Sequence, residues 1–385
     1  MEETFPILTL DKYEDSGRSI WPSPAVDARV SCNGNLKHLL TIATEKRASD
    51  LHLAASYSPM LRVDGHIVNN IDSAPPLTPD DIERVFKSIT TEEQRCTFQR
   101  ELELDFFFVV PGLARFRVNV CQQQDSLSMT FRIIPLVAPD IDELGLPNVC
   151  KRLAMERHGL VLVTGPTGVG KTTTMAAMLN HINHHAKRKI ITIEDPIEFV
   201  YGQGKSLIIQ RNLGNDTRSF AEAVRRSTRQ NPDVILIGEM RDLETISAAL
   251  TAAETGHLVI STVHTLGAAA TVDRIIDVFP HGQQQQIRLQ LSLTLTGVLS
   301  QTLVPRADGN GRLAAFEVML GTPAIRNLIR EGKCHQIENT IGVGSNYGMY
   351  TLAQDVKRLI REGAVDVEQA REVVGELVDM GKLEI

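Results

Sequence analysis

A glycine-rich segment that begins at Gly165 has the residues needed to bind a polyphosphate. It reads Gly-Pro-Thr-Gly-Val-Gly-Lys-Thr. The glycines let backbone N–H groups turn toward phosphate oxygens, Lys171 supplies a positive charge, and the Thr172 hydroxyl can bind Mg²⁺. We predict that the protein binds ATP and Mg²⁺ here. The predicted nucleotide-binding residues are Gly165, Pro166, Thr167, Gly168, Val169, Gly170, Lys171, Thr172 and Thr173.

Carboxylates follow two further predicted strands. The first ends in Glu194, with Asp195 and Glu198 just after it, and the apolar strand 233–237 is followed by Glu239. Ligands of open α/β sheets bind at the carboxyl ends of the strands, where such acids can hold Mg²⁺ through water or polarise an attacking water. For Glu194 and Asp195, the alternative that they only cap turns stays open.

Two histidines bracket another predicted strand at residues 257–262. Because His257 and His264 lie at opposite ends of it, their spacing does not suit a compact metal site. The spacing lets His264 reach the γ-phosphate edge, while His257 would brace the start of the strand. We include His257 among the candidate nucleotide-binding residues, and a purely structural role for it stays open.

The elements around these residues predict a parallel α/β core. Residues 159–164 form an apolar run typical of a buried strand, and a helical pattern follows the glycine-rich segment, as the motif requires. Strands and helices then alternate. The predicted elements are helix 171–184, strand 189–194, helix 219–230, strand 233–237, helix 242–254 and strand 257–262. Beyond about residue 280 we expect mostly helix, with one strand at 312–320.

The chain before this core predicts a separate α+β domain. A helix from Leu36, a helix that starts at Thr78, and several strands with antiparallel spacing precede the prolines near residue 135. We expect four parts. They are a loose extension (1–32), an N-terminal α+β domain (33–134), a hinge linker (135–146) and an ATPase domain with a helical C-terminal part (147–385).

Composition narrows the class of protein. The formal net charge is −7, which argues against direct nucleic-acid binding, and no apolar run is long enough to span a membrane. The five cysteines show no C-x-x-C spacing, so neither a zinc site nor a disulfide framework is predicted. We expect a cytoplasmic protein with reduced thiols.

Taken together, the motifs resemble those of the secretion-superfamily ATPases, which include the type IV pilus motors. The resemblance covers roughly residues 35–375. It rests on the phosphate loop, EDPIE at 194–198 as an aspartate box, GEMRD at 238–242 as a Walker B variant, and TGHLV to TVHT as a histidine box. It implies a RecA-like P-loop core with a PAS-like N-terminal α+β domain, and a homohexamer.

The resemblance also implies a role for each matching residue. Lys171 and Thr172 would bind phosphate and Mg²⁺, and Glu239 would be the Walker B acid. Arg117 and Arg132 would be arginine fingers, since a guanidinium can neutralise charge on a transferred phosphoryl group. The alternative that both are solvated strand residues stays open. Two further residues are assigned: Glu198 as general base and His264 as a sensor at the phosphate edge.

Within the family the chain is most similar to the retraction ATPases. The similarity lies in an amphipathic helical segment that the family uses for retraction, although periodicity alone would indicate ordinary packing. Ile325, Leu328 and Ile329 share one face. The segment consists of Ala324, Ile325, Arg326, Asn327, Leu328, Ile329, Arg330 and Glu331, of which Arg326, Arg330 and Glu331 are expected to be available to partners.

Two departures from the family pattern refine the prediction. The chain lacks the four-cysteine zinc module usual in extension motors, which favours retraction. Residues 122–125 replace an arginine–glycine loop that the family often has. We predict an ATPase motor for type IV pilus retraction, peripheral at the inner face of the cytoplasmic membrane and acting on a membrane-embedded platform protein. The alternatives are a type IVB secretion ATPase, a non-catalytic nucleotide-binding subunit, and a small-molecule P-loop kinase.

Overall fold

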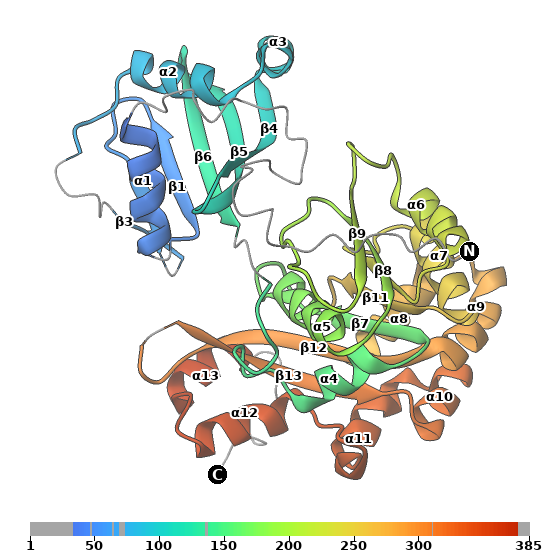
Figure 1. The fold of residues 1–385 in the computed structure, drawn as a ribbon. Helices are drawn as coiled ribbons and strands as arrows, with labels where there is room; N and C mark the ends of the chain where they lie inside the picture. Colours follow the sequence, from blue (N-terminus) through green and yellow to red (C-terminus); the bar gives the residue numbers. More distant parts are fainter. Residues whose placement is uncertain are drawn as a thin grey trace, which may run out of the picture. The chain divides into compact units, whose positions relative to one another are not determined.

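The computed structural model describes residues 34–46, 48–63, 65–68, 74–134, 138–309 and 311–375. The chain divides into two compact units, with the boundary between Ile134 and Pro135 (Figure 1). The predicted extension at 1–32 lies outside the described residues.

In its described residues, the first unit is an antiparallel sheet with three helices. Its strand order is β3-β2-β1-β6-β5-β4. Along β5, buried and more exposed residues alternate, as expected for a sheet that buries one face, and Phe116 and Phe131 are fully buried. The elements are α1 (Gly34–Glu45), β1 (Asp50–Ala54), β2 (Met60–Val63), β3 (His66–Val68), α2 (Pro79–Ile89), α3 (Glu92–Glu101), β4 (Glu103–Val110), β5 (Ala114–Gln123) and β6 (Ser126–Ile134).

The sequence predicted most of this unit. The capping box formed by Thr78 and Asp81 starts α2 at the expected position. Two elements were not predicted, for physical reasons. Strand β3 has only three residues, and α3 is so polar that Phe98 is its single buried residue.

The second unit contains a seven-stranded sheet in the order β13-β12-β7-β11-β10-β8-β9. All neighbours are parallel except β12 and β13. The central strands β7 and β11 are buried along their whole length, which explains their continuous apolar runs. The strands are β7 (Gly159–Thr164), β8 (Lys189–Glu194), β9 (Leu207–Asn212), β10 (Val234–Ile237), β11 (Leu258–Val263), β12 (Leu295–Pro305) and β13 (Arg312–Leu320).

Helices surround this sheet and complete the α/β unit (Figure 1). The long helix α5 starts at Lys171, directly after the phosphate loop, and most of its residues are buried. The helices are α4 (Asn148–Met155), α5 (Lys171–His185), α6 (Phe220–Ser227), η2 (Thr228–Gln230), α7 (Leu243–Glu254), α8 (Ala268–Asp277), α9 (His281–Thr294), α10 (Pro323–Arg330), η3 (Cys334–Gln336), α11 (Ile337–Gly342), η4 (Ser345–Tyr347), α12 (Leu352–Arg361) and α13 (Val367–Val374). Within the described residues, none of these helices combines the length and apolar character needed to cross a bilayer.

Strand β12 corrects the expectation that the C-terminal part is mostly helical with a single strand at 312–320. It starts at Leu295 directly after α9, and both of its faces are largely buried, so it shows neither a turn signal nor alternating polarity. Strand β9, at the edge of the sheet, was also not predicted. Because β12 pairs with β7, it lies beside the strand that leads into the phosphate loop.

Part of the predicted hinge at 135–146 packs on the second unit, and its action as a hinge stays a prediction. Residues 135–137 lie outside the described residues, but Ala138 and Ile141 are buried in the second unit. The Asn180 side-chain amide donates to the backbone oxygens of Ala138 and Pro139. Apolar burial therefore fixes the second half of the expected linker onto the ATPase unit.

Candidate nucleotide-binding site

The phosphate loop connects β7 to α5, and three glycines set its shape. Gly165, Gly168 and Gly170 have φ values of +138°, +84° and +85°. Side-chain-bearing residues rarely adopt such backbone angles, whereas glycine adopts them without steric cost. The loop therefore turns sharply out of the buried strand and into the helix, as the sequence motif predicted.

Lys171 lies at the start of α5 with 7% of its surface exposed. Its Nζ donates to the backbone oxygens of Gly165 at 2.8 Å and Pro166 at 2.7 Å. Burial lowers the pKa of Lys171, and the nearby carboxylate of Glu239 opposes this shift. The ammonium group therefore stands inside the loop, where a phosphate oxygen can compete with the two carbonyl groups for its protons.

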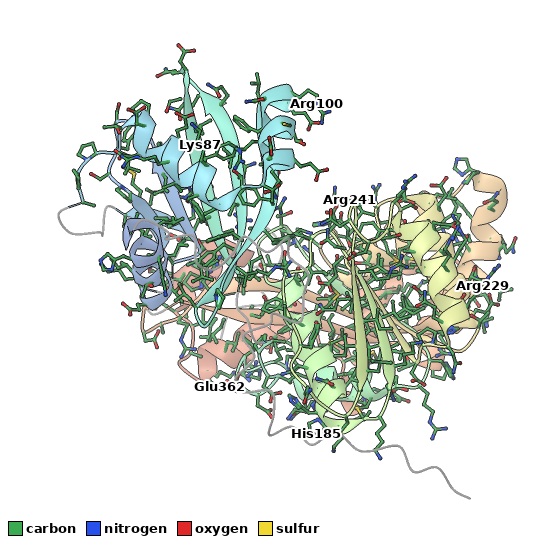
Figure 2. The ribbon with its side chains drawn as sticks, turned by 45° about the horizontal axis from the view of Figure 1, so that its top comes forward. Lys87, Arg100, His185, Arg229, Arg241 and Glu362 are labelled. Carbon is green, nitrogen blue, oxygen red and sulfur yellow. The ribbon has the colours of Figure 1, made fainter. Side chains whose placement is uncertain are left out.

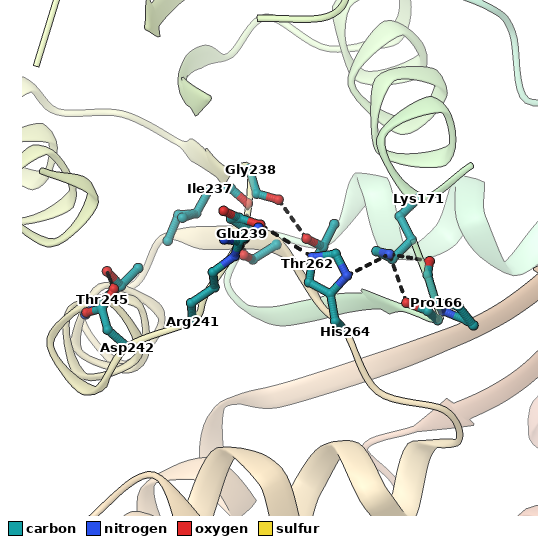
Figure 3. Close-up of polar contacts among 12 residues, drawn as sticks. Pro166, Lys171, Ile237, Gly238, Glu239, Arg241, Asp242, Thr245, Thr262 and His264 are labelled. Carbon is teal, nitrogen blue, oxygen red and sulfur yellow. Dashed lines mark hydrogen bonds and ion pairs between the residues drawn. The ribbon is translucent and has the colours of Figure 1, made fainter. Parts of the chain in front are cut away.

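A chain of polar contacts joins Lys171 to the acid of the third predicted strand (Figure 3). Lys171 Nζ lies 3.4 Å from Nδ1 of His264, and Nε2 of His264 lies 3.3 Å from Oε2 of Glu239. An ammonium group only donates, so Nδ1 must accept, which leaves the proton of the neutral ring on Nε2 to donate to Glu239. Arg241 contacts the same Glu239 oxygen at 2.9 Å.

The strand ends hold this chain in place. Thr262 on β11 donates its hydroxyl to the Gly238 oxygen at 2.7 Å, and Ser261 donates to Ile237 at 2.8 Å, which fixes the exit of β10. Asp242 then caps α7. Figure 2 shows Arg241 and His185 at opposite ends of the second unit. This is expected, because Arg241 follows the carboxyl end of β10, whereas His185 ends α5, which runs back toward the amino ends of the parallel strands.

Glu194, the last residue of β8, is buried and well bonded. Its carboxylate accepts from the Thr192 hydroxyl at 2.6 Å, the Gln210 amide at 3.2 Å and the backbone of Glu198. Burial raises the pKa of Glu194, and these three hydrogen bonds oppose the shift. Glu194 thus anchors the segment that carries Glu198, whose own side chain is exposed. The role of Glu198 as general base stays a prediction.

His257 lies at the other end of β11 from His264. Its Nδ1 is 3.0 Å from the Ala252 oxygen and 3.3 Å from the Thr255 hydroxyl, at the end of α7. Within this chain, the structure does not bring His257 to the phosphate loop. Its predicted contact with nucleotide therefore stays a prediction, and the observed contacts fit the bracing role.

Arg117 and Arg132 lie directly opposite each other on β5 and β6 of the first unit. Arg132 contacts the buried carboxylate of Asp50 at 2.9 Å, and Arg117 contacts Asp105 at 3.5 Å. Both guanidinium side chains are substantially exposed. The sheet therefore carries two adjacent, exposed arginines, each of which forms an ion pair with an aspartate. Their action as arginine fingers stays a prediction.

The predicted retraction segment forms α10 and the residue after it. Ile325 and Ile329 are fully buried, as expected, and Leu328 is partly buried. Arg326 is partly buried, and its Nε donates to the Gly321 oxygen at 2.8 Å, so it is less available than Arg330, and its predicted contact with a partner stays a prediction. Arg330 and Glu331 are exposed, and both bond to Asn327 within the segment.

The described oxygen donors suit Mg²⁺. Thr172, which follows Lys171, and Glu239 offer a hydroxyl and a carboxylate, and Mg²⁺ prefers such ligands together with phosphates and water.

The sequence did not predict a role for Gln301 on β12, whose side chain bonds to the phosphate loop. No motif marked this residue, because its strand was not predicted.

A largely parallel sheet, a phosphate loop between β7 and α5, and an acid and a histidine at adjacent strand ends define a P-loop ATPase. Residues 31–382 match the model of the family described as Type II/IV secretion system protein, and the chain belongs to this family. Family membership and the two-sheet architecture together confirm the predicted fold class.

Comparison with known proteins indicates which type of ATPase within this family the chain is. The type IV pilus retraction ATPase PilT of Pseudomonas aeruginosa is 49% identical over 338 residues, which cover 88% of this chain and 97% of PilT. The twitching motility protein of Neisseria gonorrhoeae is 48% identical over 314 residues, 82% of this chain and 83% of its own length. A crystal structure of the pilus retraction motor PilT with bound ADP is 45% identical, with a TM-score of 0.78, and covers 87% of this chain and 96% of that chain. The protein is a PilT-type ATPase.

Proposed function

We propose that this protein is the ATP-hydrolysing motor that retracts type IV pili and thereby drives twitching motility. The observation that carries the proposal is the contact chain from Lys171 through His264 to Glu239 at the opening of the phosphate loop. It joins the residue that would hold the transferred phosphate to the acid that follows β10, through the histidine that follows β11, the strand between β7 and β10. The similarity to PilT over nearly the whole length of both chains supports the assignment to retraction.

In this proposal, ATP binding rearranges contacts that already exist. The γ-phosphate replaces the Gly165 and Pro166 oxygens as acceptor of the hydrogen bonds that Lys171 donates. The shift of Lys171 changes its contact with His264 and thereby the contact of His264 with Glu239. Thr172 and Glu239 would hold Mg²⁺, which neutralises charge on the phosphates. Glu198, on the segment that Glu194 anchors, accepts a proton from the attacking water.

The mechanical step requires more than one chain. We propose a homohexamer at the inner face of the cytoplasmic membrane, in which Arg117 and Arg132 complete a nucleotide site and help to close it. The exposed side chains of α10, Arg330 and Glu331, would contact the platform protein of the pilus. Their exposure supports this role, because Ile325 and Ile329 already anchor the helix.

The test is a deletion strain scored for surface pili and twitching. Loss of retraction should leave abundant pili and no movement, and a wild-type copy should restore movement. A Glu239→Gln copy should behave like the deletion, although the protein accumulates normally. Few or no pili in the deletion strain would instead indicate an assembly motor and contradict the proposal.

A further inference from the structure

Two consecutive residues of β12, Ser300 and Gln301, bond to two different loops of the nucleotide site. Both are buried, with exposed fractions of 6% and 2%. Their strand lies between β7, which leads into the phosphate loop, and β13. Side chains of consecutive strand residues point to opposite faces of the sheet, so this pair can hold segments on both faces.

Gln301 bonds to the end of the phosphate loop and to α5, and it packs closely against the start of the loop. Its Nε2 donates to the Val169 oxygen at 2.6 Å, and its Oε1 accepts from the Thr174 hydroxyl on α5 at 2.8 Å. Its own backbone oxygen lies so close to Gly165 that a Cβ added there would come within 2.3 Å. Side chain and backbone of one residue thus fix the beginning and the end of the loop.

Ser300 and its neighbour on β13 hold the segment that follows His264. The Gly267 N–H donates to the Ser300 hydroxyl at 3.0 Å. Glu317, directly opposite Ser300, accepts from the Ala268 N–H at 2.7 Å, at the start of α8. These two bonds attach the segment that follows β11 and His264 to Ser300 on β12 and to its cross-strand neighbour Glu317 on β13.

We propose that Ser300 and Gln301 are positioning residues that hold the phosphate loop and the His264 segment in one relative arrangement. Neither residue contacts the reacting atoms in this scheme; each acts through a loop. The inference rests on the proposed function, because it concerns the same nucleotide site. It predicts different kinetic effects for the two residues, since Gln301 supports the phosphate-binding backbone and Ser300 supports the ring that links Lys171 to Glu239.

The experiment compares variants of the full chain in nucleotide affinity and turnover. Gln301→Met keeps the side-chain length and removes both hydrogen bonds, so the dissociation constant for a fluorescent ADP analogue should rise about tenfold, which corresponds to about 1.4 kcal/mol. Ser300→Ala should lower kcat by a similar factor, with nucleotide affinity within about twofold of wild type. Thr302→Val, on the same strand, is the control for perturbed packing and should match wild type.

A second set of variants tests the same hydrogen bond by replacing Thr174, the residue that donates to Gln301. Thr174→Val deletes the hydroxyl that donates to Gln301 Oε1 and should weaken ADP binding, whereas Thr174→Ser keeps the hydroxyl and should bind ADP like wild type. These variants also serve if Gln301→Met does not fold. Wild-type affinity in both Gln301→Met and Thr174→Val, or an equal loss in Thr302→Val, would overturn the inference. ADP binding is read without turnover, so an inactive wild type would refute the proposed function and leave the affinity test of Gln301 valid.

Discussion

Replacing Gly165 by alanine tests whether β12 and the phosphate loop must approach each other closely. The position has a φ of +138°, and an added Cβ would lie 2.3 Å from the Gln301 oxygen and 3.0 Å from a methyl group of Val169. Gly168 is the matched control, because its φ is +84° and no atom lies within 4 Å of the added Cβ. Both replacements strain the backbone, and only one creates a collision.

The expected losses in nucleotide affinity follow from the backbone strain at both positions and the steric overlap at Gly165. A left-handed non-glycine residue costs about 1–2 kcal/mol, which predicts a loss of roughly tenfold in nucleotide affinity for Gly168→Ala. At Gly165, ordinary carbon–oxygen contacts begin near ~3.3 Å, so the overlap is about 1 Å and the loop or β12 must move. We expect Gly165→Ala to lose more than ~3 kcal/mol, or more than roughly 100-fold in affinity.

The assay is a fluorescence titration with an ADP analogue, and circular dichroism monitors folding. Both variants should retain the wild-type spectrum at 25 °C, because both positions lie in the phosphate loop and neither replacement removes an apolar side chain of the core. If Gly165→Ala and Gly168→Ala bound nucleotide equally well, the close approach would not shape the loop and the reasoning would fail.

Further predictions concern pH, ion pairs and α10. Burial raises the pKa of Glu194 above its ordinary 4.5, so the folded state keeps a proton that the unfolded chain loses. In urea titrations the free energy of unfolding should therefore fall as pH rises between the two pKa values, and Glu194→Gln should remove that part of the slope. Arg132→Ala removes one of the ion-pair partners of the buried Asp50 and should lower the free energy of unfolding by about 1 kcal/mol in urea titrations, whereas Arg117→Ala, whose pair is exposed, should leave it unchanged. Ile329→Ala should destabilise the protein by about 2–5 kcal/mol, while Arg330→Ala should leave stability unchanged and abolish twitching in cells.

The sequence predicted those elements whose patterns are local. β7 and β8 have the predicted boundaries, because buried parallel strands give continuous apolar runs that turn residues interrupt. The phosphate loop and the acid after β10 were likewise evident, since their chemistry depends on short motifs.

Other features depend on contacts between distant segments, and no local pattern encodes them. β12 continues from α9 without a turn signal, so Gln301 was not recognised, although it bonds to Val169 over a long stretch of sequence. For a different reason, the sequence did not indicate that Arg326 bonds to the Gly321 oxygen, which is only five residues away. Its place on the polar side of an amphipathic pattern suggested exposure.

Phosphate release by the purified protein tests the central claim most directly. The wild type should hydrolyse ATP steadily. Lys171→Ala should lose turnover because the loop loses its buried cation, and Glu239→Gln should still bind nucleotide but release no phosphate above background. Circular dichroism of each variant checks that it is folded. Robust ATP turnover by a folded Lys171→Ala protein would contradict the account.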